Sequence, residues 1–253
     1  MKPFAFVFPG QGSQAVGMLD AWGDHPVVAQ TLREASDALS QDIGQLIHSG
    51  PKEALALTTN TQPVMLVAGV AAYRVWMERT GVAPNVVAGH SLGEYAALVA
   101  AGVMTLHQAA PLVRLRAQAM QEAVPVGTGA MAAILGLDAQ AVREGCAQAA
   151  AATGEVVEAV NFNDPKQTVI AGSKAAVEKA CEVLKAAGAK RALSLPVSAP
   201  FHSSLMKPAA ERLKEKLAAT PFAVPAISVV NNIDVAVLSE ADALRDALYR
   251  QAF

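Results

Sequence analysis

The sequence contains little cysteine, few aromatic residues and few charges. Only Cys146 and Cys181 occur among 253 residues, charged residues make up 17% and aromatic residues 5%. Two cysteines without metal-type spacing argue against a disulfide framework or a zinc motif, and they fit reduced, structural thiols. The formal net charge is -2 and Lys and Arg are scattered. No basic stripe is present that would neutralise phosphates, so nucleic acid is not an expected partner.

Long hydrophobic runs are also missing. The longest, such as residues 96–104, fall well short of the roughly 20 residues that cross a bilayer. Residues 4–8 form a short apolar run before Pro9 and Gly10, which is too short for the core of a signal peptide, about 7–15 residues. We therefore expect a cytoplasmic protein without a membrane partner.

Apolar residues, by contrast, are abundant at 53%, with a mean hydropathy of +0.30, so the chain can bury a large core. Its patterns alternate between short apolar runs and segments of helical period. Strands are predicted at residues 4–8, 85–88 and 226–230, and helices at 27–39, 63–79, 92–101, 106–122, 204–219 and from 241 onward. Such alternation predicts an α/β fold with a parallel sheet.

The segment between Gly129 and Pro196 has a different order. It predicts strands at residues 130–135, 156–160, 167–171 and 191–195, and helices at 138–150 and 173–187, with Asp138 and Ser173 as N-caps. The resulting β-α-β-β-α-β order is ferredoxin-like. We therefore expect a ferredoxin-like domain at residues 128–196, inserted into a large α/β-hydrolase-like catalytic domain of residues 1–127 and 197–253.

A nucleophile motif lies between a predicted strand and a predicted helix. Gly89-His90-Ser91-Leu92-Gly93 matches the Gly-x-Ser-x-Gly elbow, whose glycines let the chain turn tightly and expose the serine hydroxyl. The amide of Leu92, at the N-terminus of the new helix, would face developing negative charge. Ser91 is therefore the predicted nucleophile.

A serine nucleophile needs a base, and His202 is the best of five histidines. The other four lie in a turn, at the end of a short amphipathic stretch, on a polar helix face or beside the serine but pointing elsewhere: His25, His48, His107 and His90. His202 lies in the loop 198–204, which runs directly into a helix. The positive end of that helix favours a neutral imidazole, which can act as a general base. A surface histidine that caps a loop is the alternative.

One arginine falls on the apolar face of its helix. A period of 3.6 residues places Arg116 between Leu112 and Met120 on helix 106–122. An unpaired buried guanidinium is unfavourable, so a partner is expected. That partner is either an internal Asp or Glu, or a substrate carboxylate bound through two parallel hydrogen bonds. The second possibility would select a dicarboxylic half-thioester.

Four separated features resemble the malonyl-CoA:acyl carrier protein transacylases of bacterial type II fatty-acid synthesis. They are Phe8-Pro9-Gly10-Gln11-Gly12-Ser13-Gln14, Gly89-His90-Ser91-Leu92-Gly93-Glu94-Tyr95, Arg116 and Pro200-Phe201-His202-Ser203. The resemblance implies that Ser91 takes malonyl from malonyl-CoA as an ester and passes it to acyl carrier protein. His202 would shuttle the proton and Arg116 would bind the free carboxylate. No cofactor or metal is implied, because the CoA thioester is a substrate.

The same resemblance assigns roles that the residues alone do not. It implies that the amides of Gln11 and Leu92 form an oxyanion hole, and that Asn161 and Asn163 line the path of CoA or pantetheine, although their segment is also typical of a turn. A main-chain carbonyl near Gln251 would orient the histidine. Family members continue beyond the last residue of this sequence, so we expect the large domain to be truncated at its C-terminus.

Three other functions remain open. An α/β-hydrolase-type esterase or thioesterase would need Asp138 or Asp164 as its acid, in the chain order serine, acid, histidine. A polyketide-synthesis acyltransferase would share the chemistry but use another carrier protein. A non-catalytic module that docks a carrier protein would keep the fold without the reaction.

Overall fold

The computed structural model describes residues 2–197 and 199–253. It divides into two compact units, one of Met1–Gln118 with Leu213–Gln251, the other of Ala119–Arg212 with Ala252–Phe253. Ser198, which begins the predicted loop of His202, lies outside the described residues. The predicted domain boundaries at residues 128 and 196 stay a prediction.

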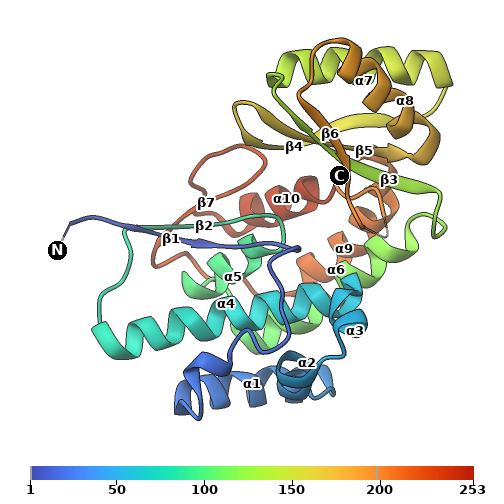
Figure 1. Cartoon of the computed structure of the whole chain (residues 1–253). Helices are drawn as coiled ribbons and strands as arrows, with labels where there is room; N and C mark the ends of the chain where they lie inside the picture. Colours follow the sequence, from blue (N-terminus) through green and yellow to red (C-terminus); the bar gives the residue numbers. More distant parts are fainter. Residues whose placement is uncertain (1, 198) are drawn as a thin grey trace. The chain divides into compact units, whose positions relative to one another are not determined.

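The first unit is built on a three-stranded parallel sheet in the order β1-β2-β7. Its strands are β1 (Ala5–Phe8), β2 (Val86–Gly89) and β7 (Ser228–Val230). Alternate side chains point to opposite faces, and the buried Phe8, Val87 and Val229 lie on the face that α4 and α5 cover (Figure 1). The predicted parallel sheet is confirmed.

Helices supply most of the first unit's core. They are α1 (Pro26–Leu39), α2 (Ile43–Ser49), α3 (Lys52–Ala56), α4 (Thr58–Thr80), α5 (Gly93–Ala100), α10 (Ala241–Gln251), most of α6 (Leu106–Glu122) and the second half of α9 (Lys207–Ala219). A short 3-10 turn lies at Asp20–Trp22 in this unit, and another, at Ser204–Met206, belongs to the second unit. The predicted bounds of α6 are those observed, whereas α2 and α3 were not predicted because each is too short to present a clear period. No helix within the described residues is long and apolar enough to cross a membrane.

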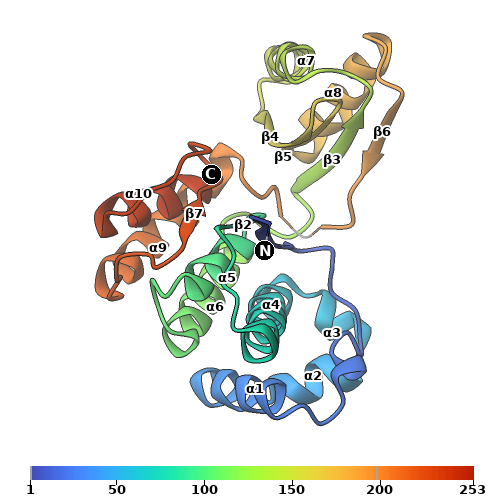
Figure 2. The same ribbon diagram turned by 90° about the vertical axis from the view of Figure 1, so that its left-hand side faces the viewer.

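The second unit holds an antiparallel sheet in the order β4-β5-β3-β6. Its elements are β3 (Gly129–Leu135), α7 (Ala139–Thr153), β4 (Val157–Asp164), β5 (Gln167–Ser173), α8 (Lys174–Ala186) and β6 (Arg191–Ser194). Both helices lie on one face of this sheet (Figure 2). Buried residues from both helices and from three strands, among them Ile134, Val142, Ile170 and Leu184, form a separate core there.

Two local predictions in the second unit fared differently. Asp138 caps α7 as predicted, since its Oδ1 accepts a hydrogen bond of 2.9 Å from the amide of Ala141. Ser173 holds the N-cap position of α8 without a side-chain capping bond, because its hydroxyl donates to Glu155 instead. The turn that the segment of Asn161 and Asn163 also indicated is present at Pro165 and Lys166, directly after β4, in which both asparagines lie.

Candidate active site

Three parallel strands end at one edge of the sheet in the first unit, and each is followed by a polar residue. Gln11 follows β1, Ser91 follows β2 and Asn232 follows β7. Phe8 pairs with Gly89 in register, and the amide of His90 donates to the carbonyl of Phe8 at 3.0 Å. Ligands of open α/β sheets bind at the carboxyl ends of the strands, so this edge is the candidate active site.

Ser91 occupies a strained turn between β2 and α5. Its φ is 52°, in the left-handed region that residues with a Cβ rarely adopt. A Cβ on Gly89 would lie 2.0 Å from the carbonyl carbon of Gly93, and one on Gly93 would lie 2.4 Å from the carbonyl oxygen of Phe8. Only glycine fits these two positions, and the predicted strand-elbow-helix geometry of the nucleophile motif is present.

Two side chains hold the backbone of Ser91. Its N–H donates to Oδ1 of Asn232 at 2.7 Å, while Nδ2 of the same Asn232 donates to the carbonyl of Gly89 at 2.6 Å. On the other side, Nε2 of Gln251 donates to the carbonyl of Ser91 at 3.0 Å. The amide and the carbonyl of the predicted nucleophile are therefore both held by side chains from the C-terminal part of the chain.

Arg116 lies directly behind the hydroxyl of Ser91. The residue is only 2% exposed, which confirms its place on the apolar face of α6. Its Nη2 donates to Ser91 Oγ and to Gln251 Oε1, both at 3.0 Å. Its Nη1 donates to Gln62 Oε1 at 2.5 Å, and Cζ lies 5.6 Å from the ring centroid of Tyr95.

The hydrogen-bond acceptors of Arg116 are neutral oxygens, of two amides and a hydroxyl. Burial lowers the pKa of Arg116, while the nearby Tyr95 and Glu94 act in the opposite direction. A guanidinium in contact with neutral oxygens can exchange one of them for an anion, and a carboxylate would bind it more strongly than an amide does. Because Arg116 contacts Ser91 Oγ, an anion bound in this way would lie beside the nucleophile.

Glu94 supplies a buried carboxyl behind the site. It is 1% exposed, and its Oε2 accepts hydrogen bonds from Gln251 Nε2 at 2.8 Å and from the amide of Asn232 at 3.0 Å. Burial raises the pKa of Glu94 to about 7, although both hydrogen bonds and the charge of Arg116 oppose the rise. Gln251 therefore bridges this carboxyl and the guanidinium of Arg116.

Glu94 should make stability depend on pH. Because its folded pKa of about 7 lies above the ordinary value of 4.5 for a glutamate, the folded state holds more protons than the unfolded state between these values. The free energy of unfolding should therefore fall as pH rises through this window. We expect Glu94→Gln to remove this fall, which amounts to about 3 kcal/mol at most.

Urea unfolding of both proteins at pH 5 and pH 8 measures the effect. The expected result is that Glu94→Gln gains stability relative to the parent protein as the pH rises. Glu215→Gln, on the exposed surface of α9, is the control for removing one carboxylate. Parallel pH curves for the parent and Glu94→Gln would show that the buried carboxyl does not titrate in this range.

Two backbone amides beside the nucleophile are open to a ligand. Within the described residues, the N–H groups of Gln11 and Leu92 donate to no protein acceptor. The side chain of Gln11 is held in place, since its Oε1 accepts a hydrogen bond of 2.8 Å from Thr58 Oγ1. Thr58 Oγ1 in turn accepts from Gln62 Nε2 at 3.2 Å, which ties Gln11 to the partners of Arg116.

His202 belongs to the second unit. Its φ is 65°, and the loop around it is braced by the hydroxyl of Ser203, which donates to the carbonyl of Pro200 at 2.7 Å. The amide of Ser204 donates to Glu158 Oε2 at 2.6 Å. His202 lines a cavity of about 650 Å³ whose walls also include Arg143, Cys146, Val157, Lys207 and Phe253. The predicted partnership of His202 with Ser91 stays a prediction.

Asn161 and Asn163 also lie in the second unit, on β4. Asn161 is half-buried and Asn163 is exposed. The structure therefore brings together five of the eight predicted site residues in the first unit: Gln11, Ser91, Leu92, Arg116 and Gln251. The other three belong to the second unit.

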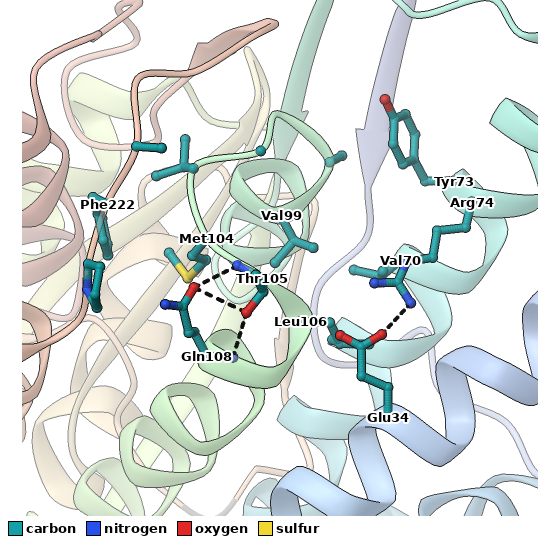
Figure 3. Close-up of a pocket in the computed structure, with 15 residues that line it drawn as sticks. Glu34, Val70, Tyr73, Arg74, Val99, Met104, Thr105, Leu106, Gln108 and Phe222 are labelled. Carbon is teal, nitrogen blue, oxygen red and sulfur yellow. Dashed lines mark hydrogen bonds and ion pairs between the residues drawn. The ribbon is translucent and has the colours of Figure 1, made fainter.

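Another cavity, of about 560 Å³, lies in the first unit and is lined by residues of α1, α4, α5 and α6 and of the segments 102–105 and 221–223. Its polar residues form two separate pairs, Arg74 with Glu34 and Gln108 with Thr105 (Figure 3). Arg74 Nη1 donates to Glu34 Oε2 at 2.7 Å, and Gln108 Oε1 accepts from the amide of Thr105 at 2.9 Å. Since these groups are already engaged, we assign this cavity no chemistry.

Sequence reasoning missed three residues that contact the site: Gln62, Glu94 and Asn232. A signal existed for the last two. Glu94 is a charged residue within the apolar run that starts α5, and Asn232 follows a predicted strand of a parallel sheet. Neither signal names a partner, because Asn232 and Ser91 are separated by 141 positions.

In residues 2–197 and 199–253, no group of three or more His, Cys, Asp or Glu side chains could hold a metal ion. The expectation that the protein needs no cofactor stays a prediction.

Comparisons with known proteins agree with this geometry. The model of the acyl transferase domain family matches residues 5–249. The malonyl CoA-acyl carrier protein transacylase of Escherichia coli (strain K12) is 56% identical over 254 residues, which cover 100% of this chain and 82% of that protein. The crystal structure of an acyl-carrier-protein S-malonyltransferase from Burkholderia pseudomallei 1710b has a TM-score of 0.96 and 66% identity, over 99% of this chain and 81% of that one.

A further solved structure contains a malonyl-transacylase in complex with a type II PKS acyl-carrier protein. It is 54% identical, with a TM-score of 0.96, and the match covers 100% of this chain and 81% of that one. With the family model matched over nearly the whole length and an elbow serine in contact with a buried arginine, the chain belongs to the acyl transferase domain family, among the malonyl-CoA:acyl carrier protein transacylases.

Proposed function

We propose that this protein transfers a malonyl group from CoA to the pantetheine thiol of acyl carrier protein, through an ester on Ser91, in fatty-acid biosynthesis. The observation that carries the proposal is the contact of 3.0 Å between Arg116 Nη2 and Ser91 Oγ. An acyl group bound to this oxygen could form hydrogen bonds with the guanidinium only if its far end were an acceptor, such as the free carboxylate of malonyl. Relatives named as malonyl transacylases support the same substrate.

In the first half-reaction, Ser91 Oγ attacks the thioester carbonyl of malonyl-CoA. The new C–O bond replaces the C–S bond, and the serine proton leaves with the CoA thiol. His202 is the proposed carrier of that proton. Arg116 holds the malonyl carboxylate, and the open amides of Gln11 and Leu92 are the proposed donors to the oxyanion of the tetrahedral intermediate.

In the second half-reaction, the pantetheine thiol of acyl carrier protein attacks the ester carbonyl. The C–S bond forms, the C–O bond to Ser91 breaks, and the serine oxygen regains a proton from the thiol through the same base. A related malonyl-transacylase has been solved in complex with an acyl-carrier protein, which supports a carrier protein as acceptor. The reaction is therefore a ping-pong transfer between two thiols.

The remaining assignments are proposals of the same kind. A main-chain carbonyl near Gln251 orients His202, and Asn161 and Asn163 line the path of CoA or pantetheine. The α/β-hydrolase-like character of the large domain is proposed on its parallel sheet and the elbow at Ser91. A ferredoxin-like domain at residues 128–196 is proposed on the β-α-β-β-α-β order. The absence of a cofactor and the cytoplasmic location stay predictions.

The partition of malonyl between transfer and hydrolysis tests this function. With malonyl-CoA and an acyl carrier protein that bears pantetheine, we expect malonyl carrier protein and free CoA in equal amounts, with little free malonate. Mass spectrometry of the carrier protein and chromatography of malonate measure both products. Free malonate without a malonylated carrier protein would contradict the transferase and favour the esterase or thioesterase.

The hydrolase alternative also lacks a placed acid. Asp138 Oδ1 is engaged as the N-cap of α7, and Asp164 Oδ1 accepts from the amide of Lys166 at 2.9 Å. Both carboxylates therefore have local structural partners. A polyketide-synthesis acyltransferase differs only in its carrier protein, and parallel assays with fatty-acid and polyketide carrier proteins distinguish the two.

A further inference from the structure

We propose that Asn232 is a positioning residue for the nucleophile. Its side-chain amide holds Ser91 in the left-handed conformation that presents Oγ for attack, and Glu94 anchors Asn232 from behind. This inference deepens the proposed acyl transfer and rests on it for the reaction. It is tested with a probe that needs no malonyl group.

Ser91 cannot keep its conformation through local preference alone. A φ of 52° is unfavourable for any residue with a Cβ, and such backbone persists only where the surrounding structure holds it. Glycines on either side allow the turn without favouring it over other conformations. Contacts from outside the elbow are therefore needed.

Asn232 makes two such contacts with one planar group. Its Oδ1 accepts from the amide of Ser91 at 2.7 Å, and its Nδ2 donates to the carbonyl of Gly89 at 2.6 Å. The two bonds span the turn, so they form together only when the elbow has this shape. They also occupy the N–H of Ser91, which leaves the amide of Leu92 as the next donor beside Oγ.

Glu94 fixes Asn232 in turn. Its Oε2 accepts from the backbone amide of Asn232 at 3.0 Å and from Gln251 Nε2 at 2.8 Å. The same Nε2 of Gln251 donates to the carbonyl of Ser91. One buried carboxyl thus accepts hydrogen bonds from both residues that hold the backbone of Ser91, and it also interacts electrostatically with Arg116.

The positioning role of Asn232 can be tested directly by substitution, because the residue is exposed and contributes little to the core. We expect Asn232→Ala to fold and to react more slowly at Ser91. The measurement is the rate of labelling by an alkyl fluorophosphonate, read by intact mass, with formation of the malonyl ester followed in parallel. Misplacement of a reacting group by about 1 Å lowers rates about 100-fold, so we expect a loss of about 10- to 100-fold in both.

Asn231→Ala is the matched control. Asn231 is the preceding residue, is buried, and donates through Nδ2 to the carbonyl of Ala236 at 2.7 Å. The variant removes the same side chain from the same loop without touching the elbow. We expect it to lower the melting temperature while the labelling rate of Ser91 stays near that of the parent protein.

Asn232→Asp adds a second measurement, the pH dependence of labelling, which would not change if Asn232 only stabilised the fold. An ionised carboxylate at this position can accept from Ser91 but cannot donate to the carbonyl of Gly89, whereas a protonated carboxyl can do both. The carboxyls of Glu94 and Asp234 and the guanidinium of Arg250 are the charged groups nearby. We expect the labelling rate of Asn232→Asp, relative to the parent protein, to rise as pH falls.

The outcomes separate the two proposals. Unchanged labelling in Asn232→Ala, or an equal loss in Asn231→Ala, would overturn the positioning role. A pH-independent ratio for Asn232→Asp would also overturn it. If Ser91 of the parent protein reacts with the fluorophosphonate but forms no malonyl ester, the proposed function fails, while the labelling rates still decide the role of Asn232.

Discussion

Ser91→Ala is expected to abolish the malonyl adduct on this protein and to lower malonyl transfer by at least about 10⁴-fold. An acyl ester needs an oxygen, and the hydroxyl of Ser91 is the only side-chain oxygen in the elbow Gly89-His90-Ser91-Leu92-Gly93. Intact mass after incubation with malonyl-CoA measures the adduct. The transfer assay with acyl carrier protein measures the rate.

Ser239→Ala is the control for this prediction, because Ser239 is exposed and its hydroxyl contacts Glu240 at the long distance of 3.4 Å. It should keep both the adduct and the rate. A malonyl adduct that persists in Ser91→Ala would place the nucleophile elsewhere. Transfer that continues unchanged without any adduct would favour direct transfer between the two thiols.

A glycine at the same position tests the strain at the elbow. Ser91→Gly should be as inactive as Ser91→Ala, but at least as stable, because only glycine adopts a φ of 52° without steric strain. Relief of that strain opposes the larger conformational entropy that glycine brings to the unfolded chain. A clear loss of stability in Ser91→Gly relative to Ser91→Ala would show that the turn is unstrained.

The elements that sequence patterns predicted well are those with a long, regular period. Helix α6 was predicted at its observed bounds, Leu106–Glu122, because its apolar residues recur over several turns. Helix α3 is five residues long, too short for any period to be recognised. The strand β4 continues to Asp164 through two irregularities of register with β5, so alternation fades before the strand ends.

The residues of the site also fall into those that the sequence could predict and those that it could not. Ser91 and Arg116 could be predicted because each breaks a local rule: a serine between two glycines at a strand end, and a charge on an apolar helix face. Asn232 and Glu94 act through contacts that only the folded chain creates. A hydrogen bond between positions 91 and 232 depends on the pairing of β2 with β7, which a single sequence does not specify.

Gln251 illustrates the limit of a resemblance. The family pattern implies a role for the main chain near this residue, whereas the structure also gives its side chain a part. That side chain accepts from Arg116, and it donates to Glu94 and to the carbonyl of Ser91. A buried amide that both donates and accepts can satisfy a cation and a carboxyl at once, so the guanidinium stays available to a substrate anion instead of closing a direct ion pair with Glu94.

Because the guanidinium of Arg116 is available to a substrate anion, replacing it should strongly change which acyl group is transferred. Arg116→Ala is expected to lower malonyl transfer by about 10²- to 10³-fold, as when one partner of a buried charge pair is removed. Transfer from acetyl-CoA, which carries no free carboxylate, should fall much less. The ratio of malonyl to acetyl transfer, measured by competition between the two CoA esters for one acyl carrier protein, is therefore expected to collapse.

Two further variants test the same prediction if Arg116→Ala is unstable. Arg116→Lys preserves the charge but not the planar fork, so its malonyl preference should be intermediate. Arg114→Ala removes a guanidinium two residues earlier on α6, one that donates to Gln41 at 2.5 Å, and should leave the preference unchanged. If the malonyl-to-acetyl ratio of Arg116→Lys and Arg116→Ala equals that of the parent protein, the guanidinium serves only to tie together Gln62, Ser91 and Gln251, and selection of the carboxylate must lie elsewhere in the chain.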